Sequence, residues 1–310
     1  MSVRAGLGWS PFEPVDPGSR GFWEAVEAIE ELGYDSLWVS DTATLADPAP
    51  LPALAAVAAR TERIKLGTGV LIAPARHPVL LAKELATVDV ISGGRLFPAM
   101  GLGIDEPRES GAIGVERGER PARLAECMAI VRALWPGEPV SHEGRFWSFE
   151  DLTLAPRPTR ARLEIWLAGH APRALRRAGR LADGWLGSFV APEEIPGIVE
   201  AIQGSAAEAG RRLDDDHFGT TLFAAQDEDC LPAEALALLD RRPGLARDDH
   251  VAVGAPAMRA LLERFVAAGA SKFVVVPLAR DLVPWLRELW LEAVGPVEAA
   301  GRGPAATGPR

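Results

Sequence analysis

Short apolar runs alternate with amphipathic stretches along almost the whole chain, and this alternation constrains the fold more than any other feature. In the first unit, an apolar run at 3–9 is followed by a stretch whose Phe22, Val26 and Ile29 share one helical face, which Gly33 ends. The strand-like runs lie at 3–9, 34–40, 64–71, 96–101, 164–168, 184–188, 218–225 and 272–276. Eight strands that alternate with helices predict a (β/α)8 TIM barrel, and a doubly wound sheet with a second domain is the alternative.

The length of 310 residues fits one large α/β barrel, and no shift in composition marks a linker between domains. We therefore expect a single domain over 1–296, with short insertions such as a hairpin that turns at 143–144. The last residues, 297–310, have little apolar content, and we expect them to form a disordered tail.

Charge and cysteine content narrow the class of protein. The net charge of −10 argues against nucleic acid or an anionic membrane as a partner. No apolar run reaches about 18 residues and none follows a basic cluster at the start, so we expect neither a membrane span nor a leader. Cys127 and Cys230 are too few for a disulfide framework. We expect a cytoplasmic enzyme that acts on a small molecule.

Several kinds of catalytic chemistry lack their residues. In a barrel the reactive groups lie where strands end, whereas Lys65 and Lys272 fall at strand beginnings and Lys83 on a helix, which argues against a Schiff base. The histidines show no metal-ligand spacing, and we expect no metal. A barrel glycosidase stays open, because one carboxylate after the fourth strand could face one after the seventh. The candidates for that pair are Asp105 or Glu106 and Asp227, Glu228 or Asp229.

Small residues gather at the predicted strand ends, in the segments LGTGV, MGLG, LAGH and DGWLGS. Glycines at these places let a flat ring or a phosphate approach the main chain closely. Gly169 and His170 run straight into a predicted helix, whose first amides suit a phosphate. For any single glycine a tight turn is explanation enough, but the set of four at one face of a barrel favours a flat, phosphorylated cofactor.

Long segments of the chain resemble the bacterial-luciferase-like superfamily of flavin and deazaflavin oxidoreductases. The segments that carry the resemblance are LGYDSLWVSD (32–41), TERIKLGTGVLIAPARHPVLLAKELATVDVISGGRL (61–96), MGLG (100–103), GVERGERPARLAECMAIVRALW (114–135), PRPTRARLEIWLAG (156–169) and AGRLADGWL (178–186). They cover residues 3–190 well, and the remainder matches by barrel pattern and by GASKFVVVPL (269–278). Their order is specific for the superfamily and much less specific for a substrate.

The resemblance implies a luciferase-like barrel with the cofactor ring at the C-terminal mouth. It also implies a cis peptide between Gly69 and Val70 behind the ring, a hydrogen bond between Asp41 and a cofactor edge, and a phosphate held by backbone near Gly169. The positions expected at the cofactor are Asp41, Gly69, Val70, Gly101, Gly103, Ala168, Gly169 and His170. Trp9 and Ser188 are expected to line the substrate pocket.

Two positions depart from the sugar-phosphate dehydrogenases of this branch. Those enzymes carry a histidine after the strand-two aspartate, where this chain has Thr42, and a glutamate after the strand-four glycines, where it has Ile104. Their acid–base pair therefore does not transfer, and sugar-phosphate oxidation is doubtful. Either the substrate needs no strong proton donor, or Thr42, Asp105 or a cofactor-bound water supplies the proton; Thr42 is the candidate catalytic residue.

From these features we expect an oxidoreductase that transfers a hydride between the deazaflavin coenzyme F420 and a small organic substrate. The alternatives are an FMN-dependent luciferase-like monooxygenase that uses reduced flavin and oxygen, a non-catalytic flavin binder, and the glycosidase. The resemblance also implies a homodimer, which would pair through the second and third helices, where an alanine-rich stretch at 53–59 permits close contact.

Overall fold

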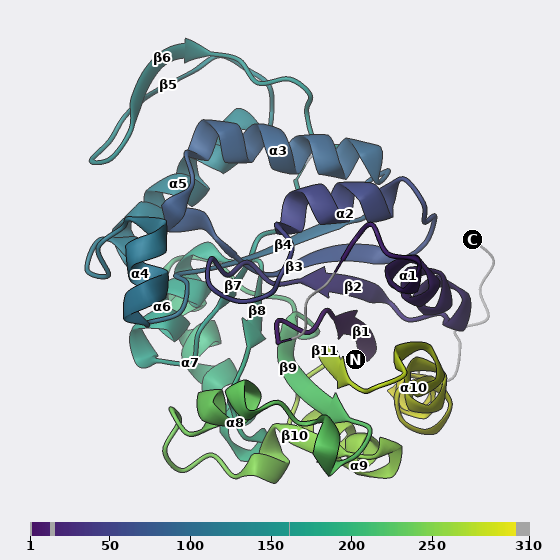
Figure 1. Ribbon diagram of the computed structural model, residues 1–310. Coiled ribbons are helices and arrows are strands. Elements are labelled where there is room, and N and C mark those ends of the chain that lie inside the picture. The colour runs from purple at the N-terminus through teal and green to yellow at the C-terminus, as the bar shows by residue number, and fades with distance from the viewer. Residues whose placement is uncertain (1, 13–15, 161, 302–310) are drawn as a thin grey trace, which may run out of the picture.

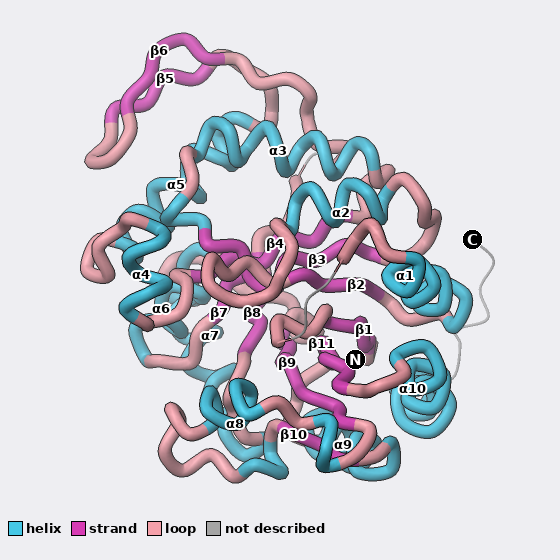
Figure 2. Tube along the Cα trace, in the orientation of Figure 1, coloured by secondary structure: helices cyan, strands magenta, loops and turns pink. Residues whose placement is uncertain are grey.

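Residues 2–12, 16–160 and 162–301 are described by a computed structural model, in which helices surround a closed parallel barrel (Figures 1 and 2). The barrel strands are β1 (Arg4–Gly8), β2 (Ser36–Val39), β3 (Lys65–Ile72), β4 (Leu96–Gly101), β7 (Trp166–Ala168), β8 (Gly184–Gly187), β9 (Phe218–Ala225) and β11 (Lys272–Leu278). Each pairs with the next in this order, and β11 pairs with β1 through Lys272 opposite Arg4. The predicted (β/α)8 barrel is confirmed.

The helices cover the outside of the barrel (Figure 2). They are α1 (Arg20–Leu32), α2 (Pro50–Ala58), α3 (Pro78–Ile91), α4 (Pro107–Ile113), α5 (Arg120–Leu134), α6 (Pro172–Leu181), α7 (Ile195–Glu208), α8 (Ala233–Leu239), α9 (Ala255–Ala267), α10 (Leu282–Leu289) and α11 (Gly295–Gly301). Helix α1 shows how the sequence defines them. Ser19 accepts a hydrogen bond from the Phe22 amide at its start, and Gly33 ends it with φ +91°. Its Phe22, Val26 and Ile29 are buried, as the predicted apolar face requires.

A ninth strand, β10 (Val251–Val253), was absent from the sequence-based expectation. It pairs with the end of β9, Val251 opposite Phe223, whereas β8 pairs only with the beginning of β9. Since β11 occupies the other side of β9, β8 and β9 diverge at their carboxyl ends and β10 lies in the opening. A run of three residues is too short to register as a strand by alternation.

Strands β5 (Val140–Glu143) and β6 (Ser148–Leu152) form the expected hairpin, which projects beyond α3 and α5 (Figure 1). Glu126 of α5 holds it by accepting hydrogen bonds from the Phe146 and Trp147 amides, at 3.1 and 3.0 Å. The hairpin is therefore an ordered insertion in the barrel pattern.

The predicted disordered tail begins too early. Residues 297–301 belong to α11, where Val297 and Glu298 are buried. Glu298 accepts a hydrogen bond from the Ala5 amide at 2.8 Å and so attaches α11 to β1. One buried pair suffices to order this turn although the segment is poor in apolar residues. The rest of the predicted tail, 302–310, lies outside the described residues.

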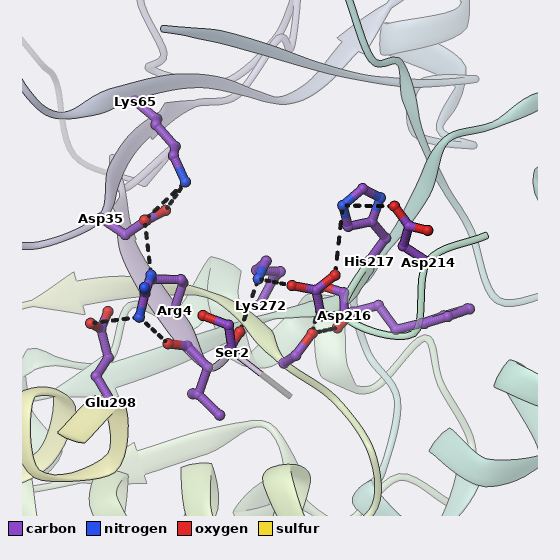
Figure 3. A network of polar contacts seen from close by, with 12 residues as sticks. Ser2, Arg4, Asp35, Lys65, Asp214, Asp216, His217, Lys272 and Glu298 are labelled. Carbon is purple, nitrogen blue, oxygen red and sulfur yellow. Dashed lines mark hydrogen bonds and ion pairs between the residues drawn. The ribbon is translucent and has the colours of Figure 1, made fainter. Parts of the chain in front are cut away.

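Charged side chains close the amino-terminal end of the barrel (Figure 3). Lys65 pairs with Asp35 at 3.1 Å, and Lys272 lies 3.0 Å from the Ser2 carbonyl and 3.3 Å from Asp216. Lys65 and Lys272 thus lie at the amino-terminal end of the barrel, away from the carboxyl ends of the strands, as the sequence predicted. Among the helices that the structure describes, none is long and apolar enough to cross a membrane.

Candidate active site at the carboxyl ends of the strands

A cavity of about 430 Å³ opens at the carboxyl ends of the barrel strands. The loops after β2, β4, β7 and β8 contribute to its wall, together with Gly69 and Val70 within β3. Of the residues predicted for the site, it brings together Asp41, Thr42, Gly69, Val70, Gly101, Gly103, Ala168, Gly169, His170 and Ser188. The prediction from strand ends therefore located one continuous site.

The structure places Trp9 in a different cavity, between β1, α1 and the loop after β11. Its ring packs against Phe22, with ring centroids 4.6 Å apart. Because β1 ends at Gly8, Trp9 lies just beyond the strand, and its side chain points toward α1 instead of the barrel mouth. Trp9 does not line the candidate active site.

Backbone forms one side of the candidate site. The Gly69–Val70 peptide is cis, as expected, and the register between β3 and β4 shifts at this point. A Cβ on Gly101 would lie 2.5 Å from the Val70 Cγ2, so only glycine fits opposite Val70. Gly103 has φ +79°, a conformation that favours glycine. A flat ring can thus approach the main chain closely here.

Asp41 joins the end of β2 to the end of β3. Its carboxylate accepts a hydrogen bond from the Ile72 amide at 2.9 Å and pairs with Arg76 at 2.9 and 3.0 Å. Both oxygens therefore have partners within the protein, although the residue also lines the cavity. Sequence reasoning missed Arg76, whose only signal is a cation shortly after β3. A contact between Asp41 and a cofactor stays a prediction.

Thr42 lines the cavity, and its hydroxyl donates a hydrogen bond to the Asp47 Oδ2 at 2.7 Å. The pKa of Asp47 is raised to about 6, mainly by burial and also by the charges of Asp41 and Glu109. The hydrogen bond from Thr42 acts in the other direction and lowers it. Glu109 of α4 fixes the same loop, because it accepts from the Ala43 amide at 3.0 Å and the Thr44 hydroxyl at 2.8 Å. Asp47 was not among the predicted site residues.

The other acidic candidates do not face the cavity. Asp105, the alternative proton donor, forms an ion pair with Arg117 and is 55% exposed. Glu106 accepts from the Glu109 amide at the start of α4. The strand-seven candidates are also paired: Asp227 and Asp229 with Arg280, and Glu228 with Arg247. Among the described lining residues, the two-carboxylate arrangement of a glycosidase is absent.

One end of the cavity is cationic. Arg177 of α6 lines it, and within the described part of the chain no hydrogen-bond or ion-pair partner reaches its guanidinium. Burial lowers its pKa, and it stays charged in the neutral range. Side chains on a helix lean toward its N-terminus, so Arg177 extends toward Ala174 and the Gly169–His170 turn, which line the same cavity. Sequence reasoning identified this turn but not Arg177.

His170 itself is neutral near pH 7, since burial and the nearby Arg242 cation lower its pKa. Gly169 has φ +111°, and a Cβ there would lie 2.9 Å from the Ala174 Cβ. The turn into α6 thus brings backbone close to the cavity without adding charge. Arg177 remains the cation available to an anionic ligand.

Another part of the cavity wall is largely apolar. Its side chains include Phe12 and Phe223, whose ring centroids are 5.7 Å apart, and Phe189, which packs on His250 at 4.6 Å. His250 is buried and burial lowers its pKa to about 3, so it adds no charge behind this wall at neutral pH. The described residues also contain no group of three or more acidic, histidine or cysteine side chains placed to hold a metal ion.

Fold and site together define a (β/α)8 barrel with a cavity at the carboxyl ends of its strands and the Arg177 cation in its lining. The sequence profile of the family described as luciferase-like monooxygenase matches residues 13–301. The chain belongs to this family.

Named relatives align with the chain over part of their length. The chain is 35% identical over 198 residues to the F420-dependent glucose-6-phosphate dehydrogenase of Microbacterium testaceum, which covers 60% of the chain and 58% of the relative. It is 35% identical over 156 residues to a phthiodiolone/phenolphthiodiolone dimycocerosates ketoreductase of Mycobacterium kansasii, with 49% and 42% covered. The matched region thus spans less than two thirds of these curated relatives.

Solved structures share the whole fold at low identity. An F420-dependent secondary alcohol dehydrogenase with an F420–acetone adduct superposes with a TM-score of 0.80 at 19% identity, over 96% of this chain and 99% of that one. The oxygenating constituent of 3,6-diketocamphane monooxygenase of Pseudomonas putida, in complex with FMN, gives 0.78 at 20%, over 95% and 99%. At these identities the likeness shows the fold alone.

Proposed function

We propose that this protein is an oxidoreductase that transfers a hydride between coenzyme F420 and a small, uncharged organic substrate. The observation that carries the proposal is the pairing of a backbone-lined side at Gly69–Val70 and Gly101 with one unpartnered cation, Arg177. A deazaflavin has a flat ring and an anionic side chain, which match these two features. The relatives named F420-dependent glucose-6-phosphate dehydrogenase support the same cofactor.

The residues present fit this cofactor. Backbone at Gly69, Val70 and Gly101 would bear the ring, and Arg177 with the Gly169–His170 turn would hold the phosphate. When bound, the deazaflavin supplies a carbon that accepts or donates a hydride. The chain's own contribution is to orient the substrate, exclude water with the apolar wall, and exchange a proton at the Thr42 hydroxyl.

The substrate class follows from the wall that faces this ring. Thr42 and Ile104 both line the cavity, at the two positions where the sugar-phosphate dehydrogenases are expected to carry histidine and glutamate. Phe12, Phe189 and Phe223 make the surroundings apolar. A secondary alcohol or a ketone suits this environment better than a sugar phosphate, because a second phosphate would lack a partner beyond Arg177.

The second candidate is a monooxygenase that uses reduced FMN and oxygen, and the family description favours it. The same backbone and cation suit FMN, which also combines a flat ring with a phosphate. A flavin-binding protein without turnover is the third candidate.

Titration of the apo protein with F420 and, separately, with FMN distinguishes these functions. Trp185 donates to the Gly169 carbonyl at 3.0 Å and Trp38 lies beside Gly69, so tryptophan fluorescence should report a ligand bound in the cavity. Micromolar F420 binding with weak FMN binding, followed by turnover of ketones or secondary alcohols, supports the proposal. Tight FMN binding with oxygen consumption replaces it with the monooxygenase, and binding without turnover of either kind favours the non-catalytic role.

We also propose that the protein acts as a cytoplasmic homodimer. Leu80, Val90 and Ile91 of α3 are exposed apolar side chains beside α2, where the sequence predicts pairing. The free cysteines Cys127 and Cys230 suit a reducing compartment. Light scattering that gives the chain mass of 33.0 kDa would refute the dimer.

A further inference from the structure

The loop after β2 places a carboxyl group directly behind a hydroxyl of the cavity wall. We propose that Thr42 and Asp47 form a proton relay, in which Thr42 exchanges a proton with the substrate oxygen and Asp47 supplies or receives it through Thr42. The inference rests on the proposed hydride transfer. It assigns a source for the proton that the departures at Thr42 and Ile104 leave unassigned.

The geometry has the polarity that a relay requires. The Thr42 hydroxyl donates to the Asp47 Oδ2 at 2.7 Å, which leaves the lone pairs of the same oxygen available at the cavity. The Asp47 Oδ1 is buried and has no hydrogen-bond partner among the described residues. The carboxyl group is therefore not already committed to a cation or to a helix cap.

The loop holds these two groups in place from outside the relay. Glu109 of α4 accepts from the Ala43 amide and the Thr44 hydroxyl, and Ala46 donates to the Pro11 carbonyl at 3.2 Å. These contacts fix the residues between Thr42 and Asp47. Thr42 and Asp47 thus lie at the two ends of a short segment that hydrogen bonds hold in place.

The charges around Asp47 place its proton affinity in a useful range. Burial raises the pKa of this carboxyl, and the charges of Asp41, two residues after β2, and of Glu109 in α4 raise it further. Arg76 offsets the charge of Asp41, and Glu109 accepts hydrogen bonds from one backbone amide and one hydroxyl. A carboxyl whose pKa is about 6 can gain and lose a proton near neutral pH.

Other groups in the cavity fit this role less well. Of the described hydroxyls that line it, only Thr42 donates to a carboxylate, and Ser40, Ser188 and Thr221 do not. Asp41 is held by Arg76 and the Ile72 amide. Thr42 is therefore the place where a proton can leave the cavity.

The step balances for alcohol oxidation. The C–H bond of the alcohol breaks and its hydride passes to the oxidised deazaflavin, which is the two-electron acceptor of the proposed function. The O–H proton of the alcohol forms a bond to the Thr42 oxygen, whose own proton moves to the Asp47 Oδ2. Ketone reduction runs the same transfers in reverse, starting from protonated Asp47.

Infrared difference spectra of the apo protein test the titration without any cofactor. Aspartate labelled with ¹³C should show a protonated carboxyl band that disappears with an apparent pKa near 6, within about one unit. Asp47→Asn should remove that band, and Thr42→Val should move its pKa upward, because it removes the hydrogen bond that lowers it. A band that is unchanged in Asp47→Asn, or that titrates near pH 4, overturns the relay.

Turnover of reduced F420 with a panel of uncharged ketones tests the transfer itself. The wild-type rate should fall as pH rises through the Asp47 pKa, and this fall is the limb of the pH–rate profile that the relay predicts. Asp47→Asn and Thr42→Val should both lose the limb, together with about 100-fold or more in rate. Thr42→Ser should restore the limb, since serine keeps the hydroxyl. Asp105→Asn, which removes an exposed carboxylate paired with Arg117 outside the cavity, is the matched control and should keep the limb.

The outcomes separate the relay from the proposed function. Turnover with an identical pH profile in wild type and Asp47→Asn refutes the relay and leaves hydride transfer standing. A wild-type protein that binds no F420 refutes the proposed function, and the relay with it. An altered KM with an unchanged pH limb in Asp47→Asn shows that Asp47 only positions the loop, which also refutes the relay.

Discussion

The ion pair between Asp41 and Arg76 offers the sharpest test of how the site is built. The Asp41 side chain is 14% exposed, and it accepts from the Ile72 amide in addition to Arg76. Asp41→Ala therefore removes charge-assisted hydrogen bonds that are each worth about 1.5–3 kcal/mol, and leaves Arg76, itself 29% exposed, without its partner. We expect this variant to lose about 2–4 kcal/mol of unfolding free energy.

Arg76→Ala should cost less, because Asp41 keeps the Ile72 amide and faces the cavity, where water can solvate it. We expect about 1–2 kcal/mol for this variant and a coupling of about 1–2 kcal/mol between the two in a double-mutant cycle. Urea unfolding of the wild type, both single variants and the double variant measures these values. F420 titration of the same four proteins then separates a structural role of Asp41 from direct contact.

If Asp41 acts by tying β2 to β3, Arg76→Ala should weaken F420 binding nearly as much as Asp41→Ala. If Asp41 also contacts the cofactor, Asp41→Ala should weaken binding by about 1–3 kcal/mol more than Arg76→Ala does. Strictly additive unfolding energies, with a coupling below about 0.5 kcal/mol, would refute the ion pair as a structural unit. Unchanged F420 affinity in both variants would exclude Asp41 from the cofactor site.

Three further predictions test other parts of the site. Gly101→Ala should push Val70 away and cost about 1–3 kcal/mol in urea unfolding, whereas Gly111→Ala, in open space on α4, should stabilise the protein by about 0.5–1 kcal/mol; equal effects would exclude crowding at Val70. Arg177→Gln should weaken F420 binding about 10–100-fold, whereas Arg176→Gln, on the exposed face of α6, should not; similar losses would point to net charge alone. Because the pKa of Asp47 is raised in the folded protein, its contribution to stability is full below about pH 4 and is lost as pH rises through about 6. The unfolding free energy of Asp47→Asn should therefore rise by about 3 kcal/mol relative to wild type between these two pH values. A difference that stays constant with pH contradicts the raised pKa.

The sequence located the parts of the site that depend on backbone. Strand ends are read from apolar alternation, and glycines such as Gly101 and Gly169 mark where the chain needs space or positive φ. Both signals depend on neighbouring residues in the sequence, so they can be read without knowledge of the tertiary fold. The cis peptide at Gly69–Val70 came from the resemblance alone and is present.

The parts that escaped prediction depend on how far side chains reach. Arg177 enters the cavity from α6, Arg76 reaches Asp41 from the loop after β3, and Asp47 accepts a hydrogen bond from Thr42. Their sequence neighbourhoods resemble any polar loop or helix surface, because reach and burial are set by packing between distant elements. The prediction for Trp9 was wrong because this residue lies just past the end of β1, where the alternation of the strand no longer determines which side a side chain faces.

The charge balance of the cavity argues for an anionic cofactor and a neutral substrate together. Asp41 is compensated by Arg76, and Asp105 by Arg117 outside the cavity, whereas Arg177 is half-buried with no partner among the described residues. A buried charge without a counterion costs free energy, which binding of an anion recovers. Among the described lining residues, Arg177 is the only lysine or arginine, so this gain in free energy is available once, at the α6 end. The same protein therefore favours one phosphate-bearing ligand and disfavours a second charged molecule beside Thr42.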